Sequence, residues 1–550
     1  MKALSDLYYK FGRPREDRWP VIAFMLCLAI LPVVAGCMKV GPDFEPPAAP
    51  EDQTWIEENN PKIDKGPVDN VSWWRVFNDP AINELVVTAY IENLTLQTAG
   101  LRVLEARARL GIAIGDQYPQ VQEANGSLSG NSLSKNAANG AGANRNFSST
   151  SVGLDASWEV DFWGKFQRGI ESADAQLGAT VADYDDALVT LTADVVNSYI
   201  LMRAAEERID FANQNIEIQG KGLDLATAKY ETGATSKLDV AQARALLNET
   251  KALVPGFETD RRRAQNTLAV LLGTIPRELP AYLEKPGKIP SPPKEVAIGI
   301  PADLIRRRPD IREAEMSAAA QSAQIGIAQA DLYPQFSLAG MIGFESSGGG
   351  GVQSNNADLV DLFDSGSFAT SFGPSVTIPL FNYGRITNNV RAQDARFQQL
   401  LTTYQNQILE AYAEVENGLV GYLRALEQAQ FYALSVEALK EAVGLSLLQY
   451  KEGESSYQRV LDSQANLVQL EDDWVESRSA VAQNLIATYK ALGGGWEIRG
   501  VDAFVPEKTQ EIMRRRTDWG DLLSPEDLKD APLTTEDLEG LDTLFRRPDW

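Results

Sequence analysis

The sequence predicts a mixed α and β membrane protein built from very long helices and short groups of β-strands. Two stretches, 166–230 and 386–450, repeat an apolar or small residue every three or four positions, which is the pattern of an amphipathic α-helix. Each helix would be roughly 100 Å long at 1.5 Å per residue. Apolar and polar residues alternate strictly at 152–162, 336–344 and 368–380, which predicts β-strands with one apolar face.

These elements occur twice in the same order, so the chain is an internal duplication. The repeated positions lie 215 residues apart before the strands (333 − 118) and 220 apart after them (384 − 164). The matched pairs are Tyr118 and Tyr333, Gly164 and Gly384, Gly233 and Gly453, and Gly273 and Gly493. We therefore expect a first repeat at 79–273 and a second at 301–493. Each would hold helices, two strands and a long helical hairpin.

The N-terminus has the features of an exported lipoprotein. Basic residues precede an apolar run at 21–35, which is too short for a transmembrane helix and is typical of a signal peptide. The run ends in Val34-Ala35-Gly36-Cys37, which resembles the bacterial lipobox. We expect residues 1–36 to be removed and Cys37 to carry S-diacylglycerol and N-acyl (palmitate) chains, which anchor a protein stably. The alternative is an ordinary signal peptide with a chance Cys.

The destination of the lipoprotein is indicated by the residues after Cys37. They are Met38 and Lys39, and neither is the Asp that retains a lipoprotein at the inner membrane. By resemblance to lipoprotein sorting signals, this favours the outer membrane. Once the signal peptide is removed and Cys37 is acylated, the chain has no free thiol, so we expect no disulfide framework.

Three segments lie outside the repeats. Residues 37–78 form the acylated leader, which starts with a proline-rich stretch and ends near the aromatic residues Trp73 and Trp74. Residues 274–300 are a second proline-rich stretch and would be the linker that crosses between the repeats. Residues 494–550 are rich in Asp, Glu and Pro without periodicity, and we expect a mostly disordered C-terminal extension.

Composition excludes several kinds of function. The 550 residues carry a formal net charge of −25, which argues against nucleic acid because phosphate binding needs basic patches. His is absent, which removes the commonest metal ligand and general base. An exported hydrolase with paired carboxylates is a further alternative, but no pattern places two carboxylates in one cleft. We expect no enzyme activity, no metal and no cofactor besides the lipid.

The strands require a larger assembly than one chain. A lipid-facing sheet must close on itself, because unpaired backbone groups are costly in hydrocarbon. Four strands cannot close alone, whereas three copies would supply twelve strands for a barrel and helices for a tube. The polar Gly-, Asn- and Ser-rich loops would then face the exterior, and the helices would extend into the periplasm. The alternative is a periplasmic coiled-coil scaffold or adaptor lipoprotein without a pore, although such a protein would not need the strands.

Several motifs on this duplication carry a family resemblance. They are Val34-Ala35-Gly36-Cys37, Trp73-Trp74-Arg75-Val76-Phe77, Trp158-Glu159-Val160-Asp161-Phe162-Trp163-Gly164, Arg307-Arg308-Pro309-Asp310-Ile311-Arg312-Glu313-Ala314-Glu315, Phe381-Asn382-Tyr383-Gly384-Arg385 and Leu461-Asp462-Ser463-Gln464-Ala465. Together they make residues 37–496 resemble the TolC-like outer-membrane efflux proteins, in particular the lipidated OprM or NodT type.

The resemblance implies both an architecture and a function. The protein would be a homotrimer with a twelve-stranded β-barrel on an α-helical periplasmic tunnel. It would passively export drugs or other small toxic solutes across the bacterial outer membrane as the exit duct of a tripartite efflux system. The energy would come from an inner-membrane pump, reached through a periplasmic adaptor. The lipoprotein form favours a pump of the resistance-nodulation-division (RND) type.

The resemblance also implies a gate at the periplasmic end of the second hairpin. In this family the Asp of a Leu-Asp-Ala-Gln motif, here Asp462, points into the tunnel at its narrow end. Gln458 precedes it by one helical turn and lies on the same face. Three copies of Asp462 would form an acidic ring that attracts cations. The alternative is that Asp462 is a solvated charge near a helix start.

The hairpin turns around Gly233 and Gly453 are the candidate docking sites for the adaptor, because they lie farthest from the strands. Gly233 suits the left-handed position that ends a helix. In the first hairpin Asp239 and Arg244 are candidates for interhelical ion pairs near the tip. The alternative is that both are ordinary surface charges.

Overall fold

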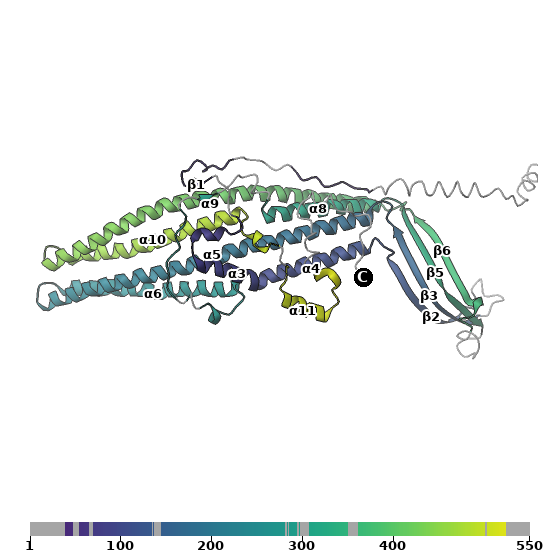
Figure 1. Ribbon diagram of the computed structural model, residues 1–550, viewed down its shortest axis with the longest axis horizontal. Coiled ribbons are helices and arrows are strands. Elements are labelled where there is room, and N and C mark those ends of the chain that lie inside the picture. The colour runs from purple at the N-terminus through teal and green to yellow at the C-terminus, as the bar shows by residue number, and fades with distance from the viewer. Residues whose placement is uncertain are drawn as a thin grey trace, which may run out of the picture.

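The computed structural model describes residues 39–47, 54–64, 70–134, 136, 145–280, 283, 285–293, 296–297, 307–349, 361–500 and 503–523. Within them the chain is a long rod of helices with a sheet of strands at one end (Figure 1). The expected signal peptide and the acylated Cys37 lie outside the described residues. None of the described helices is both long enough and apolar enough to cross a membrane.

The described elements follow the duplication. The first repeat contains α3 (Pro80–Glu92), α4 (Leu94–Gly115), β2 (Val121–Ser132), β3 (Asn146–Val160), α5 (Lys165–Glu231) and α6 (Lys237–Leu271). The second contains α8 (Pro309–Ala330), β5 (Gln335–Gly349), β6 (Phe368–Thr377), α9 (Arg385–Glu452) and α10 (Tyr457–Ala491). The two long helices are confirmed: α5 has 67 residues and α9 has 68.

The four strands form one antiparallel sheet in the order β2-β3-β5-β6. The two repeats meet where β3 pairs with β5. Opposed residues such as Leu154 and Ile342 put apolar side chains on one face, whereas Ser151 and Glu345 lie on the other. The apolar face is uncovered, since Leu154 is 60% exposed and Phe372 is 76% exposed. Within the described residues, the outer edges of β2 and β6 pair with no strand.

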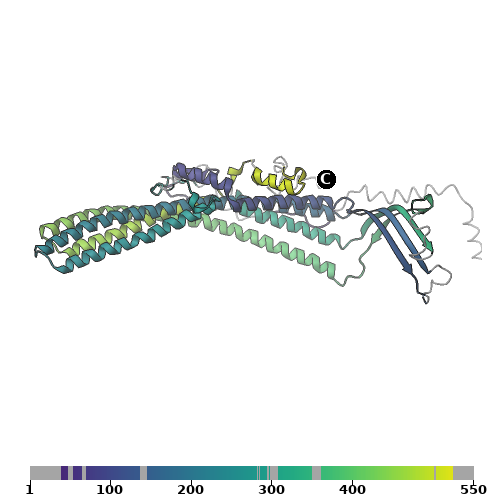
Figure 2. The ribbon, with the colours of Figure 1, turned by 90° about the horizontal axis from the view of Figure 1, so that it is seen from below.

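The long helices lie side by side in one layer (Figure 1). Towards the tip the order across the layer is α9, α10, α5, α6, and towards the sheet it is α9, α8, α5, α4. A set of shorter segments, which we call the belt, packs on one side of this layer. The belt comprises η2 (Trp73–Phe77), α3, residues 285–293 and α11 (Glu507–Arg516). In Figure 2, α3 in purple and α11 in yellow lie together on that side of the helices.

Apolar burial fixes the belt to the layer. Trp73 is 1% exposed and stacks on Tyr489 of α10, with 5.4 Å between ring centroids. Gly494 and Gly495 make this approach possible, because a Cβ atom on Gly494 would lie 2.9 Å from the Trp73 ring. The aromatic residues of the leader are therefore core residues.

The C-terminal segment differs from the expected disordered extension. Residues 503–523 include α11 and η7 (Gly520–Leu523), and four of their apolar side chains are buried: Phe504, Val505, Met513 and Leu523. Arg107 of α4 donates through Nη1 to the Leu522 carbonyl at 2.6 Å. The expectation was wrong for this part, because so short a helix leaves no sustained periodicity in the sequence. Residues 524–550 lie outside the described part.

Arg308 joins three helices where the second repeat begins. Its guanidinium donates to Asp310 and to Glu414 of α9, at 2.7 and 2.8 Å, and to the Ala491 carbonyl at the end of α10, at 2.7 Å. Pro309 occupies the first position of α8, where its missing N–H costs nothing. The Arg-Pro-Asp motif is therefore a structural clamp.

The clamp has a titratable neighbour in Asp186 of α5. Burial raises the pKa of Asp186 to about 6, and the negative charge of Asp310 adds to the effect, while Arg308 and Lys490 oppose it. The unfolded chain loses this proton at lower pH than the folded chain. Stability contributed by protonated Asp186 is therefore fully present below about pH 4 and is lost as the pH rises towards 6.

We expect Asp186→Asn to remove this pH dependence. The variant should be more stable than the parent by about 1–3 kcal/mol above pH 6 and nearly equal to it at pH 4. Thermal unfolding followed by circular dichroism at pH 4, 5, 6 and 7 measures the difference. A constant difference between the two proteins across this range would contradict the assignment.

Candidate constriction and docking tip

The two hairpin turns are built in the same way. Gly233 has φ +74° and Gly453 has φ +85°, both in the left-handed region that favours glycine. The Ala234 N–H donates to the Lys229 carbonyl, and the Glu454 N–H donates to the Gln449 carbonyl, each at 2.8 Å. Each of these hydrogen bonds reaches the carbonyl five residues earlier, so α5 and α9 both end in a Schellman motif. Both turns lie at the end of the rod opposite the sheet (Figure 1).

A small apolar cluster holds the two turns next to each other. It consists of Ala226, Val240, Ala243, Tyr450, Tyr457, Val460 and Leu461. The Tyr450 and Tyr457 rings meet edge to face with 4.9 Å between centroids. Lys229 Nζ of the first hairpin donates to the Tyr450 carbonyl of the second at 2.6 Å. The tip is therefore one packed unit made from both repeats.

The expected gate residues lie on the outside of this unit. Asp462 and Gln458 are both exposed, and Gln458 Nε2 donates to Asp462 Oδ1 at 2.8 Å. Gln242 of α6 donates to Gln458 Oε1 at 3.4 Å. The structure thus brings Asp462 and Gln458 together on one helical face and adds Gln242, which sequence reasoning missed. Asp462 can form an acidic ring only together with the same residue of two further copies of the chain, so the gate stays a prediction.

Asp239 makes an interhelical contact of a different kind from the expected ion pair. Its carboxylate accepts from the Tyr450 hydroxyl at 3.3 Å and from the Thr235 hydroxyl at 2.5 Å. Burial raises the pKa of Tyr450, and the nearby Asp239 charge acts in the same direction. Arg244 is exposed, and none of the salt bridges within the described residues includes it. An ion pair of Arg244 stays a prediction.

Charged contacts between the two hairpins, above the tip, were not found from the sequence. Arg208 of α5 donates to both oxygens of Asp472 of α10, at 2.6 and 2.9 Å. Glu471, which is 2% exposed, accepts from Asn215 at 2.5 Å and from Lys440 at 2.8 Å. The Arg208–Asp472 and Asn215–Glu471 partners are more than 200 residues apart in the sequence, so no local pattern pairs them, whereas Lys440 belongs to the same hairpin as Glu471. These contacts place charged groups in the α5–α10 seam, beside the contact between the Phe211 and Trp474 rings.

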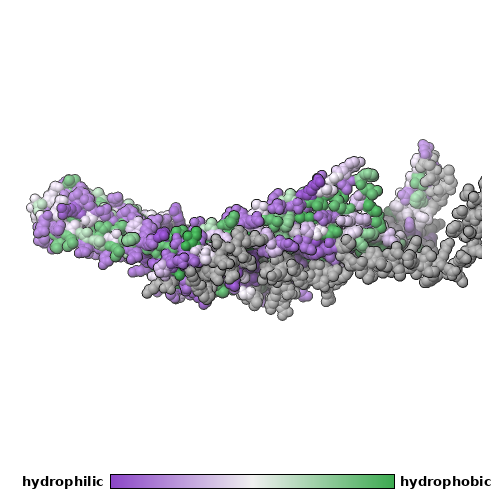
Figure 3. All heavy atoms as spheres, turned by 90° about the horizontal axis from the view of Figure 1, so that it is seen from above, coloured by the Kyte–Doolittle hydropathy of each residue, from purple (hydrophilic) through white to green (hydrophobic). Residues whose placement is uncertain are grey.

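The sheet end has the chemistry of a membrane segment. Its apolar face is exposed, and the loop from β6 to α9 adds Ile378, Leu380 and Phe381, which are 56%, 76% and 87% exposed. Figure 3 shows hydrophilic residues along most of the helical part and hydrophobic residues gathered towards its sheet end. An apolar band beside one end of a polar rod defines a protein that stands in a membrane and reaches far into water.

Comparisons with known proteins agree with this class. The family model "Outer membrane efflux protein" matches residues 85–274 and 300–494. Nodulation protein T of Rhizobium leguminosarum bv. viciae is 30% identical over 477 residues, covering 86% of this chain and 94% of the relative. The pyoverdine export protein OpmQ of Pseudomonas putida is 31% identical over 77% of this chain and 88% of OpmQ.

Two further comparisons extend the likeness. "Probable outer membrane lipoprotein SilC" of Salmonella typhimurium is 29% identical over 86% of this chain and 98% of SilC. The solved structure of the outer-membrane channel OprN superposes with a TM-score of 0.77 at 31% identity, covering 83% of this chain and 99% of OprN.

The chain belongs to the outer membrane efflux protein family. It is an outer-membrane efflux channel of a tripartite system, with its helical part in the periplasm. The family consists of channel proteins rather than enzymes. Membership favours the channel over the pore-less scaffold and over the exported hydrolase.

Proposed function

We propose that three copies of the chain close into the exit duct, with a twelve-stranded barrel above a helical tunnel. The observation that carries this proposal is a four-stranded sheet with an exposed apolar face and, within the described residues, no strand on the outer edge of β2 or β6. In hydrocarbon such edges are costly, and pairing β6 of one copy with β2 of the next removes them. The face with Ser151 and Glu345 would then line the water-filled lumen.

The lipid anchor would stand beside the barrel. The leader is fixed from Lys39 onward, two residues after Cys37. The Val40 N–H donates to the Trp163 carbonyl at 3.1 Å, Arg168 Nε donates to the Val40 carbonyl at 3.1 Å, and Lys39 pairs with Glu171 at 2.6 Å. These contacts lie where β3 leads into α5, at the sheet end of the rod. Acyl chains on Cys37 would therefore enter the membrane that surrounds the sheet. The lipoprotein name of SilC supports the same modification.

The duct would be passive and would receive its cargo from a periplasmic adaptor and an inner-membrane pump of the RND type. The tip turns around Gly233 and Gly453 would dock the adaptor, since they extend farthest from the sheet (Figure 1). The cargo would be drugs or other small toxic solutes. Three copies of Asp462, each hydrogen-bonded to Gln458, would narrow the periplasmic entrance as an acidic ring.

We expect purified protein in planar bilayers to give a small, cation-selective current. Asp462→Ala should enlarge this current and lower its selectivity, because the acidic ring loses its charge. Glu454→Ala is the matched control, since it removes an exposed carboxylate from the turn and not from the helical face of Asp462. If the current of Asp462→Ala equals that of the parent protein, the acidic ring is wrong and the duct still stands. Protein that inserts but never conducts would overturn the duct itself.

Gly233→Val and Gly453→Val test the docking turns. A β-branched residue in the left-handed region should cost about 1–2 kcal/mol locally and distort the turn, although open space surrounds both positions. We expect loss of drug export in cells while trimers still form. Gly220→Val is the control, because Gly220 lies within α5, where open space likewise surrounds a Cβ atom. Normal export by both turn variants would remove the turns from the docking site.

A further inference from the structure

The helical layer has two faces of different character. On one face Arg203 of α5 donates to the Lys285 carbonyl at 2.8 Å, and Glu207 accepts from the Ile289 N–H at 2.8 Å. These contacts attach the belt. Asp194 precedes Arg203 by nine residues, which is two and a half helical turns, so it lies on the opposite face of α5. In the proposed duct the belt surrounds the tube, and the face of Asp194 looks into the lumen.

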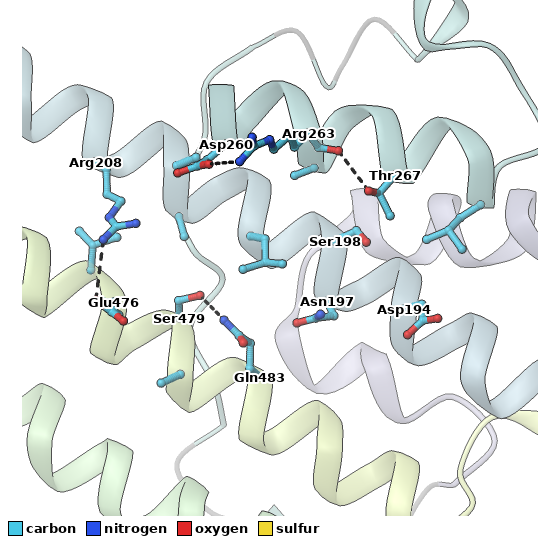
Figure 4. Close-up of a pocket in the computed structure, with 17 residues that line it drawn as sticks. Asp194, Asn197, Ser198, Arg208, Asp260, Arg263, Thr267, Glu476, Ser479 and Gln483 are labelled. Carbon is cyan, nitrogen blue, oxygen red and sulfur yellow. Dashed lines mark hydrogen bonds and ion pairs between the residues drawn. The ribbon is translucent and has the colours of Figure 1, made fainter. Parts of the chain in front are cut away.

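The lumen-side face contains a recess between α5, α6 and α10 (Figure 4). Its volume is about 660 Å³, within the range of pockets that hold drug-sized ligands. The floor is apolar and includes Leu201, Ala205, Ala264 and Val475. Leu201 is 43% exposed, so part of this floor is open to a solute. The recess therefore offers an apolar surface inside a polar tube.

The charges around the recess have a negative surplus. Asp194, Asp260 and Glu476 contribute carboxylates, while Arg208 and Arg263 contribute guanidinium groups. Arg208 is held by Asp472, which lies outside the lining, and Arg263 is 3.5 Å from Asp260. Glu476 lies 3.8 Å from Arg208 and is 72% exposed.

Two polar groups of the recess have no partner within the described part of the chain. Asp194 makes no ion pair or hydrogen bond there, and its carboxylate is labelled in Figure 4 beside Asn197. Ser198 is 7% exposed, and its hydroxyl likewise makes no hydrogen bond within the described residues. The Ser198 hydroxyl lines the recess, where water or a ligand can supply its hydrogen bond. Both groups are therefore available to a ligand.

We propose that this recess is a transient binding site for amphipathic organic cations as they pass through the duct. The apolar body of such a solute lies on Leu201 and Leu271, which line the recess and are not buried, and its positive group lies near Asp194 and Glu476. Exposed carboxylates contribute little to binding, so binding is weak. Weak binding suits a conduit, because a solute must also leave. The inference rests on the proposed duct and adds a solute class to it.

Ethidium is a suitable probe, because it is an aromatic cation whose fluorescence rises in apolar surroundings. We expect purified trimers in detergent to bind ethidium saturably and to bind fluorescein, an anion, at least about tenfold more weakly. Leu201→Lys and Leu201→Glu form a matched pair at the exposed floor position. The Lys variant should weaken ethidium binding by about tenfold or more, while the Glu variant should retain or strengthen it.

The double variant Asp194→Asn with Glu476→Gln should weaken ethidium binding by about tenfold. Asp210→Asn is the control, because Asp210 is an exposed carboxylate seven residues from Arg203 and thus on the belt face of α5. Asp210→Asn should bind as the parent does. Equal ethidium affinity in the parent, both Leu201 variants and the double variant would overturn the recess as a cation site.

Conductance measured on the same preparations separates this inference from the duct. Parent protein that conducts ions but binds ethidium and fluorescein equally overturns the recess and leaves the duct standing. Parent protein that inserts without conducting overturns the duct, and the inference fails with it. Conducting trimers whose ethidium affinity follows the charge at position 201 support both.

Discussion

The pairing of β3 with β5 is the contact on which the rest of the structure depends. It joins the two repeats into one sheet, so that α5 and α9 leave the same sheet and run in the same direction. The two backbones approach closely at Gly153 and Gly343, where a Cβ atom on Gly343 would lie 2.4 Å from the Val152 carbonyl oxygen. Without this pairing each repeat would hold a two-stranded ribbon, which is marginal in water.

From that shared start the helical layer is stabilised unevenly along its length. At the belt, Trp73, Tyr199 and Tyr422 are almost fully buried and belong to the largest apolar cluster. Burying such side chains contributes about 1.5–3 kcal/mol each. Along the seam towards the tip, Arg208–Asp472 and the contacts of Glu471 are polar, and hydrogen bonds contribute a net value nearer 1 kcal/mol each. The rod is therefore held most firmly at the belt.

The sequence predicted the elements whose signal is long and periodic, namely α5, α9 and the alternating strands. It failed where the signal is short. Phe504 and Met513 of the C-terminal segment become buried only because α4 and α5 provide a surface for them to pack on. The approach to α4 is close, since the Phe504 carbonyl oxygen would lie 2.1 Å from a Cβ atom on Gly100. The Tyr450 partner of Asp239 lies 211 residues away. The recess was also missed, because its lining comes from three helices.

The uneven stabilisation of the helical layer is consistent with the chemistry of its lumen-side face, which the belt does not cover. A tube whose wall is polar does not retain cargo, because water and solute compete equally for the same hydrogen bonds. Apolar surface such as Leu201 interrupts that wall at the level of the belt, where the rod is best supported. Towards the tip Gln458 and Asp462 are exposed polar residues, and Leu238 is an exposed apolar residue at 63%. The tip is joined by one small apolar cluster and by polar contacts, whereas the belt holds the much larger apolar cluster. Separating the two hairpins at the tip would therefore expose less apolar surface than separating the layer at the belt, which suits a narrow periplasmic entrance.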